Sequence, residues 1–568
     1  MCGIVGYVGK QNAKAILVEG LHRLEYRGYD SAGVAFVRAG RLSVYKAQGK
    51  VAQMEALLPG RIGAQIGIGH TRWATHGAPS DVNAHPHTDT QGRVAVIHNG
   101  IIENAVALRE ELIASGIELV SETDTEILAH MIAAADQGNL MDALRKTLMR
   151  IHGAYGLAVI SQDHPDQIVV ARNGSPVVLG IGEKEMFVAS DVAALVRHTQ
   201  KVVYLDDGEI ATLKRDGYEV VRLDASPATK TTATVDIDLE AFDKETYAHF
   251  TLKEIHDQPE VIERVLRGRC DHRFATARLD GLNLDPKAVL SIRRVKVLGC
   301  GSAYIAGSIG ARMIESLARI PCDAESAAEF RYRNPIIERD TLYLAVSQSG
   351  ETFDTLAAVE EIKRKGGTVL GVVNAVGSSI ARACSGGVYL HAGAEVAVVS
   401  TKTFSATLIV FALIALLLGR TRDVSHAEGE RLLKALHELP DLLRGELKRE
   451  EEFAALAKRY SHFDHAYFIG RNAGYDLATE GALKLKEISY IHAEAYPASE
   501  LKHGPLALIS PTTPTVAIVP DDGLIAKNTA TIEEIRSRQG PVLAITQVDD
   551  LDKTAQKDGG PLEILKVP

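Results

Sequence analysis

The sequence predicts an α+β domain at the N-terminus, followed by α/β domains built on parallel sheets. In roughly the first 240 residues, short β-type runs such as GIVGYVG and RVAVIHNG are separated by glycines and helical stretches, a mixture typical of α+β layers. Beyond Gln258, apolar runs such as VKVLG and TLYLAVS are each followed by a glycine or serine turn and a helical pattern. That alternation is typical of a doubly wound parallel sheet.

An internal repeat divides the C-terminal part. The run VKVLG begins at Val295 and the run AYFIG at Ala466, 171 residues later, and the same offset relates Glu329 to Glu500. Two landmarks at one offset favour a duplicated unit. With a charged boundary segment at 238–258, we expect a first domain at 1–240, a linker and helical lead-in at 241–285, a first α/β domain with connecting helices at 286–460, and a second α/β domain at 461–568.

The composition is that of a folded enzyme or binding protein. Hydrophobic residues make up 46% of the 568-residue chain and charged residues 24%, which excludes an intrinsically disordered protein. The formal net charge of −10 argues against nucleic-acid binding, which needs a basic surface. The apolar run at 408–419 is shorter than the roughly twenty residues that span a bilayer. We therefore expect a buried core helix there and no membrane partner.

The five cysteines are few and scattered. They include no CxxC pair and no Cys/His cluster with zinc spacing, so we expect no disulfide framework, no metal site and no cofactor. The start, MCGIVGYVGK, lacks the basic and apolar regions of a signal peptide. The expected location is the reducing cytoplasm.

Cys2 carries the most specific chemistry of the N-terminal part. It directly follows the initiator methionine, whose removal would place a thiol and a free α-amine on one residue. An α-amine with a pKa of roughly 7.7–8.0 is a suitable base at neutral pH. It would activate the neighbouring thiol as a nucleophile. The alternative interpretation is an inert, buried cysteine in a first strand.

Downstream motifs decide between these two interpretations. CGIVG is followed in order by RGYDSAG, HTRWATHG, NAHPH, HNGIIEN and SETDTE. Together they resemble the class II glutamine amidotransferase domain, an N-terminal-nucleophile (Ntn) hydrolase with αββα layers, over residues 2–240. The resemblance implies that Cys2 attacks the amide carbon of glutamine, forms a thioester and releases ammonia.

The same resemblance assigns the groups that surround this nucleophile. Asn99 and the backbone amide of Gly100 would form the oxyanion hole, where loss of one donor typically costs about 10²–10³ in rate. Arg72 would bind the α-carboxylate of glutamine, because its fork of donors suits a planar anion. Asp124 would bind the α-ammonium group.

Three further residues complete the expected glutamine pocket. Thr75 and His76 would line it, and Trp73, the single tryptophan of the chain, would be a mobile gate on the path of ammonia. The histidines near these motifs are interpreted as ordinary hydrogen-bonding residues without a proton-transfer role: His76, His85, His87 and His98.

Hydroxyl-rich turns follow the apolar strands of the C-terminal part. LGCGSAY, SQSGET and VVSTKTFS place neutral donors at the carboxyl edge of the sheet, where such folds bind ligands, and these donors suit a phosphate group. Together with EGALKLKEISYIHAEAY and ELKHGPLALI, they resemble the sugar isomerase (SIS) domain. The resemblance implies that a sugar phosphate is bound by Gly301, Ser302, Ser347, Gln348, Ser349, Thr352 and Ser400.

The two parts together resemble the glutamine–fructose-6-phosphate aminotransferases, or glucosamine-6-phosphate synthases. This resemblance implies conversion of D-fructose 6-phosphate to D-glucosamine 6-phosphate with L-glutamine as nitrogen donor, the first step of hexosamine synthesis. Glu487 would move a proton between C1 and C2, and Lys484 would lie on the same helical face. His503 would open the sugar ring from a partner subunit, which implies a homodimer. The buried face of the helix is expected to consist of Leu483, Leu485 and Ile488.

Other interpretations remain open at this point. Lys484 and Glu487 alone could be a solvated ion pair worth a few tenths of a kcal/mol. A different class II amidotransferase would need a phosphoribosyl-binding loop or an SGGxDS-type pyrophosphate loop, and the sequence contains neither. A sugar-phosphate-binding regulator would keep the phosphate loops without needing Cys2, Glu487 and His503 together.

The repeat also leads us to expect that the second copy is incomplete at its C-terminus. The first copy extends to about Arg420, so an offset of 171 would carry the second about 23 residues past Pro568. The counterpart of the apolar helix at 408–419 is then expected to be missing, as is a tail whose lysine the resemblance places over the sugar. Glutaminase activity with impaired synthase activity is therefore the alternative to the full reaction for such a chain.

Overall fold

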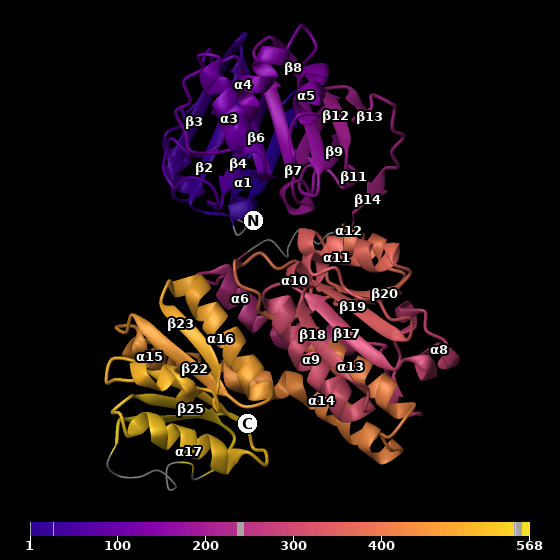
Figure 1. Cartoon of the computed structure of the whole chain (residues 1–568), viewed down its shortest axis with the longest axis vertical. Helices are drawn as coiled ribbons and strands as arrows, with labels where there is room; N and C mark the ends of the chain where they lie inside the picture. The colour runs from indigo at the N-terminus through magenta and orange to yellow at the C-terminus, as the bar shows by residue number, and fades with distance from the viewer. Residues whose placement is uncertain (1, 26–27, 236–243, 550, 552–558) are drawn as a thin grey trace. The chain divides into compact units, whose positions relative to one another are not determined.

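The computed structural model describes residues 2–25, 28–235, 244–549, 551 and 559–568. The chain divides into two compact units, residues 1–243 and 244–568, and Figure 1 labels many of the helices and strands of each. Met1 and the first part of the charged boundary segment, 238–243, lie outside the described residues.

The first unit is rich in strands, with five α-helices and a 3₁₀ helix among its described residues. The helices are α1 (Ala13–Leu24), α2 (Val51–Ala56), α3 (Ala105–Ala114), α4 (Thr125–Ala135), α5 (Leu140–Leu148) and η2 (Val192–Ala194). The strands are β1 (Gly3–Val8), β2 (Ser31–Arg38), β3 (Arg41–Gln48), β4 (Ile66–Arg72), β5 (His87–Thr88), β6 (Val94–Ile102), β7 (Gly153–Ser161), β8 (His164–Asn173), β9 (Val178–Gly182), β10 (Glu185–Ala189), β11 (Lys201–Tyr204), β12 (Glu209–Lys214), β13 (Gly217–Arg222) and β14 (Ala233–Thr234).

Two antiparallel sheets stack face to face in this unit. Their strand orders are β14-β11-β9-β10-β1-β4-β2-β3 and β13-β12-β8-β7-β6-β5. The layer between them is buried and apolar and includes Ile4, Ile68, Ile97 and Ile160. Helices α1 and α2 cover the outer face of the first sheet, and α4 and α5 cover that of the second. The predicted αββα layers are therefore confirmed.

The second unit contains two parallel sheets and the helices that cover them. Its helices are α6 (Phe250–His256), α7 (Gln258–Leu266), η4 (Asp280–Leu282), α8 (Pro286–Ser291), α9 (Ser302–Ala318), α10 (Ala327–Tyr332), α11 (Phe353–Arg364), α12 (Ser379–Ala383), α13 (Lys402–Arg420), α14 (His426–Leu447), α15 (Glu450–Tyr460), α16 (Ala473–Ser489), η5 (Leu501–His503), η6 (Pro505–Leu508) and α17 (Ile525–Arg536). Its strands are β15 (Cys270–Asp271), β16 (Thr276–Ala277), β17 (Arg294–Gly299), β18 (Cys322–Ser326), β19 (Thr341–Ser347), β20 (Val369–Val373), β21 (Gly387–Tyr389), β22 (His465–Gly470), β23 (His492–Pro497), β24 (Thr515–Val519), β25 (Val542–Thr546) and β26 (Leu562–Lys566).

The two sheets have the same strand order. The first is β18-β17-β19-β20-β21 and the second β23-β22-β24-β25-β26, and every pairing within them is parallel. In each sheet, the strand that comes first in the chain, β17 or β22, lies between the second, β18 or β23, and the third, β19 or β24. The predicted α/β fold with parallel sheets is confirmed.

The repeat at an offset of 171 extends to individual backbone angles. Both ends of α9 and α16 are related by this offset. Their N-caps, Gly301 and Asn472, have φ of 57° and 50°, and their C-caps, Arg319 and Tyr490, have φ of 53° and 61°. The two copies therefore use the same left-handed entry and exit around their first helix.

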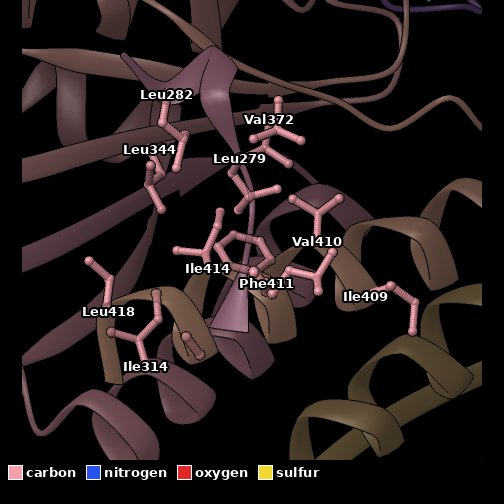
Figure 2. Close-up of a cluster of buried hydrophobic side chains, with 14 of the residues drawn as sticks. Leu279, Leu282, Ile314, Leu344, Val372, Ile409, Val410, Phe411, Ile414 and Leu418 are labelled. Carbon is pink, nitrogen blue, oxygen red and sulfur yellow. The ribbon is translucent and has the colours of Figure 1, made fainter. Parts of the chain in front are cut away.

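The apolar run at 408–419 belongs to α13, which is a core helix as predicted. Figure 2 shows its side chains, including Val410, Phe411 and Ile414, packed against strands of the first sheet and against α9. Gly310 of α9 permits this contact, because a Cβ there would lie 2.2 Å from the Phe411 ring. The helix is long and apolar enough to cross a bilayer, but 72% of its most apolar stretch is buried within the protein.

In the second sheet, α15 and α16 cover one face and α17 the other. Leu456 of α15 packs on Leu543 and Leu565 of the last two strands, while Ala478 and Ala482 of α16 pack on β22 and β23. The opposite face is covered by α17, through residues such as Ile535. Both faces of the sheet are thus covered by helices.

Candidate functional site

Cys2 lies directly before β1, a strand buried along its whole length in the middle of its sheet. Pairing of β1 with β4 sets Gly3 opposite Thr71, and so brings Cys2 to the residue that follows β4. The backbone N–H of Trp73 donates to the Cys2 Sγ at 3.2 Å. The thiol is partly exposed, so it is accessible to a small substrate.

Asn99 and Gly100 lie near the end of β6, and Asn99 contacts Cys2. The Asn99 Nδ2 donates to the Cys2 carbonyl oxygen at 3.0 Å. Gly100 has a φ of 137°, and a Cβ there would lie 2.0 Å from the Ala154 carbonyl oxygen. Only glycine fits this conformation. The structure thus brings the two residues predicted for the oxyanion hole next to the nucleophile.

Arg72 is the last residue of β4 and is 3% exposed. Its Nη2 donates to the carbonyl oxygens of His76 and Gly77. Its Nη1 is buried and has no hydrogen-bond partner among the described residues. Burial lowers the pKa of the guanidinium, whereas the nearby Cys2 and Asp124 raise it. The Arg72 Nη2 is thus held by two carbonyl groups of the protein, and the Nη1 remains to bind an anion.

Asp124 occupies the N-cap position of α4 and is buried. Its Oδ2 accepts a hydrogen bond from the Ile102 N–H at 2.9 Å, which ties it to the end of β6. Its Oδ1 lies 4.0 Å from the His98 Nδ1. The carboxylate predicted to bind the α-ammonium group therefore lies beside the strand that carries Asn99 and Gly100.

The segment after β4 differs from these residues because it is exposed. Trp73 is 41% exposed, and its ring lies edge-on to that of Tyr29 with the centroids 5.2 Å apart. Thr75 and His76 are also exposed, and their side chains lie 3.3 Å apart. The three predicted pocket residues thus form a surface segment that begins beside the Cys2 thiol.

Four histidines are buried in the interior of the first unit: His70, His85, His87 and His98. His70 stacks on His85 with ring centroids 4.3 Å apart, and its Nε2 lies 2.9 Å from the Asn99 Oδ1. Burial lowers the pKa of His70 to about 3, and it also lowers the pKa values of His85, His87 and His98. These side chains are neutral hydrogen-bonding groups. The contact of His70 with Asn99 was not predicted, although His70 opens the HTRWATHG motif.

Several of the predicted sugar-phosphate residues lie at the carboxyl edge of the first parallel sheet. Gly301 and Ser302 follow β17, and Ser347 ends the neighbouring strand β19. The Ser347 Oγ accepts from the Gly350 N–H at 2.9 Å and lies 3.3 Å from the Thr352 Oγ1. The next two strands, β18 and β19, lie on opposite sides of β17, and the carboxyl edge at such a reversal of strand order is where α/β folds bind ligands.

The other predicted residues of this group lie in two loops. The Gln348 carbonyl oxygen accepts from the Ala375 N–H, and the Ser349 Oγ accepts from the Glu351 N–H. Ser400 lies two residues before α13, and its Oγ is 2.7 Å from the Thr403 Oγ1. The contacts of the described residues do not join Ser400 to the loop at 347–352.

A line of polar groups connects the first copy to the second. The Ser302 Oγ donates to the Glu480 Oε1 at 2.7 Å. The Lys484 Nζ lies 3.5 Å from the same Glu480 oxygen and 2.6 Å from the Glu487 Oε2. Glu480 thus joins the beginning of α9 to Lys484, which in turn pairs with Glu487.

Glu480 was not predicted as part of this site. It is 7% exposed, and burial raises its pKa while Lys484 lowers it. Glu480 lies four residues before Lys484 and seven before Glu487, so all three share one face of α16. This spacing could have identified Glu480 from the sequence.

One expectation for this region differs from the structure. Ile488 is 57% exposed, so its expected burial was wrong, whereas Leu483 and Leu485 are partly buried. The small residues Ala478 and Ala482 form the buried part of this face together with Leu485, because α16 packs closely on its sheet and on α9. His503, which is predicted to act from a partner subunit, is exposed at the end of η5. In the part of the chain that the structure describes, it makes no contact with Lys484 or Glu487.

Two family models match the chain. The glutamine amidotransferase domain matches residues 70–197, and the SIS domain matches residues 289–417 and 460–557.

Curated relatives match along nearly the whole chain. A glutamine–fructose-6-phosphate aminotransferase [isomerizing] of Thermus thermophilus is 48% identical over 552 residues, covering 97% of this chain and 91% of the relative. The protein of the same name from Chlorobaculum tepidum is 46% identical over 558 residues, with the same coverage of both. Among solved structures, the C-terminal domain of glucosamine-fructose-6-phosphate aminotransferase from Francisella tularensis matches with a TM-score of 0.54 and 33% identity, over 57% of this chain and 90% of that one.

Proposed function

The chain belongs to the isomerizing glutamine–fructose-6-phosphate aminotransferase family, and we propose how its two candidate sites divide that reaction. The overall activity is transfer of the amide nitrogen of L-glutamine to D-fructose 6-phosphate, which gives D-glucosamine 6-phosphate and glutamate, the first step of hexosamine synthesis. The observation that carries the division is that one chain holds both the Cys2–Asn99 contact and the line from Ser302 to Glu487.

The first site releases ammonia from glutamine. After removal of Met1, the Cys2 α-amine takes the thiol proton, and the sulfur forms a bond to the amide carbon. Negative charge develops on the amide oxygen, which the Asn99 Nδ2 and the Gly100 N–H stabilise. The C–N bond then breaks, the α-amine returns its proton to the departing ammonia, and water hydrolyses the thioester to glutamate.

Glutamine is held by groups of opposite charge. The unpaired Arg72 Nη1 binds the α-carboxylate, and Asp124 binds the α-ammonium group. Thr75 and His76 line the exposed side of the pocket. Trp73 opens and closes the way out for ammonia, a role supported by the hydrogen bond from its backbone N–H to the Cys2 Sγ.

The second site binds and isomerises the sugar. Hydroxyl groups of Ser347, Ser349 and Thr352, at the N-terminus of the twelve-residue helix α11, bind the phosphate. The remaining contacts to the sugar are proposed from Gly301, Ser302, Gln348 and Ser400.

Ammonia adds at C2, water leaves to give the imine, and Glu487 then moves the proton between C1 and C2. The Lys484 Nζ lies 2.6 Å from the Glu487 Oε2, and this ion pair holds the carboxylate in position. Because ammonium ion is not nucleophilic, ammonia has to reach C2 without equilibrating with bulk water.

We further propose that the protein is a homodimer in the cytoplasm. The exposed position of His503 supports a role in opening the sugar ring of a partner subunit. Among the described residues, Cys270, Cys300, Cys322 and Cys384 form no disulfide, which agrees with a reducing compartment.

The test is an assay of both half-reactions on the same preparation. Glucosamine 6-phosphate formation from glutamine and fructose 6-phosphate is measured beside glutamate release without sugar. We expect both products. Glutamate release without amino-sugar formation would contradict the role proposed for the second site. The absence of both products would contradict the roles proposed for both sites.

A further inference from the structure

The loop that carries Ser400 is held by carboxylates rather than by a sheet. Residues 391–400 contain no helix or strand, yet Val396, Ala397 and Val399 are buried. Buried backbone N–H groups need partners. In this segment, two acidic side chains accept hydrogen bonds from backbone N–H groups, one from within the loop and one from α6.

Glu254 of α6 holds the first part of the loop. It is 2% exposed, and its Oε1 accepts from the Val396 N–H at 2.5 Å and the Ala397 N–H at 3.1 Å. Glu395 holds the second part, because its Oε1 accepts from the Thr401 N–H at 2.9 Å and the Thr403 N–H at 3.1 Å. The two carboxylates thus bracket the stretch that contains Ser400.

The helices α6 and α7 make two further contacts with the same segment. The Lys402 Nζ, which is buried, donates to the Asp257 Oδ2 at 2.9 Å. The Ser405 Oγ donates to the Gln258 Oε1 at 2.5 Å. Lys402 belongs to the STKT motif, but its side chain pairs with Asp257 and brings a positive charge near Glu254. Burial and the neighbouring Glu395 raise the pKa of Glu254 to about 7, against the opposing effect of Lys402.

We propose that Glu254 is a positioning residue for the sugar phosphate, because its carboxylate fixes the loop that presents Ser400. The inference rests on the proposed role of Ser400 in sugar binding. Glu254 itself does not touch the sugar in this proposal. It acts as an acceptor for two backbone N–H groups, so an uncharged side chain with an oxygen at the same position should replace it.

The experiment measures fructose 6-phosphate binding to the full chain by calorimetry. Glu254→Ala removes the acceptor and should raise the Kd at least tenfold. Glu254→Gln keeps one oxygen for both N–H groups and should remain within about threefold of the unsubstituted protein. Glu260→Gln makes the same chemical change at an exposed position of α7 and should bind normally. Glutamine hydrolysis without sugar should be unchanged in all three.

Hydrogen exchange provides a second readout if Glu254→Ala is poorly folded. The milder Glu254→Asp shortens the side chain by one methylene and should increase exchange at Val396 and Ala397, with α13 unaffected. The inference is overturned if Glu254→Ala binds as tightly as the unsubstituted protein, or if Glu254→Gln is impaired as strongly as Glu254→Ala. If the unsubstituted chain fails to bind fructose 6-phosphate, or Ser400→Ala binds normally, the proposed sugar site itself is wrong.

Discussion

The His70 Nε2 lies 2.9 Å from the Asn99 Oδ1 in a part of the first unit that is closed to solvent. Because the His70 pKa is lowered to about 3, the ring is neutral and its Nε2–H can donate to the amide oxygen. This contact directs the other end of the amide, the Nδ2, toward Cys2. A histidine outside the reacting groups thus sets which end of Asn99 faces the nucleophile.

Replacing His70 by phenylalanine should lower kcat for glutamine hydrolysis about tenfold or more. The Asn99 amide loses the partner that orients it, and a missing oxyanion-hole donor costs about 10²–10³ in rate. KM for glutamine should change little, because Arg72 and Asp124 are intact. Steady-state glutaminase kinetics check this, with His22→Ala at an exposed position as control. An unchanged kcat would show that Asn99 is oriented by other contacts.

Replacing Cys2 by alanine should abolish glutamine hydrolysis and leave sugar binding intact. The substitution removes the sulfur that forms the thioester but keeps the β1 backbone pairing. Glutamate release and fructose 6-phosphate affinity are measured on one preparation. Residual hydrolysis by the variant would refute Cys2 as the nucleophile.

Replacing Glu487 by glutamine should block the proton shift between C1 and C2. Glutamine is almost isosteric but cannot accept the proton, so we expect a loss of at least about 10² in amino-sugar formation with little change in fructose 6-phosphate affinity. Exchange of the C1 hydrogen with deuterated solvent follows the step directly. Glu494→Gln, at a partly buried position on β23, is the matched control. Normal exchange in Glu487→Gln would remove Glu487 from this role.

The first unit should lose stability as the pH falls below about 6.5. His70, His85, His87 and His98 have lowered pKa values in the fold, so the unfolded chain binds more protons below its ordinary histidine pKa of about 6.5. Above that pH these neutral rings contribute their full stabilisation. Below it, each ring lowers the free energy of unfolding by about 1.4 kcal/mol per pH unit. For His70 this loss continues down to a pH of about 3.

Urea unfolding followed by the fluorescence of Trp73 measures this effect at pH 7.5 and pH 5.5. The variant His87→Gln, which keeps a hydrogen-bonding group near Thr123, should show a shallower dependence. Equal free energies of unfolding at the two pH values would contradict the prediction.

The sequence predicted elements and local motifs well, because these depend on residues close together in the chain. The offset of 171 extends to the φ angles of Gly301 and Asn472, since a duplicated strand–turn–helix needs the same turn. Long-range partners were missed. Ser302 meets Glu480 across 178 residues, and Glu254 meets Val396 across 142. Ile488 was misplaced because an apolar pattern alone does not show that α16 packs through its alanines.

The position of α6 has a practical consequence for dividing the gene into modules. A fragment that starts at residue 289, where the first SIS match begins, would retain both parallel sheets but discard Glu254, Asp257 and Gln258. One that starts at Lys244, the first residue of the second unit, would retain them. Chimeras that exchange the ammonia-producing half between species should therefore be joined before Lys244, so that each acceptor half keeps its own α6.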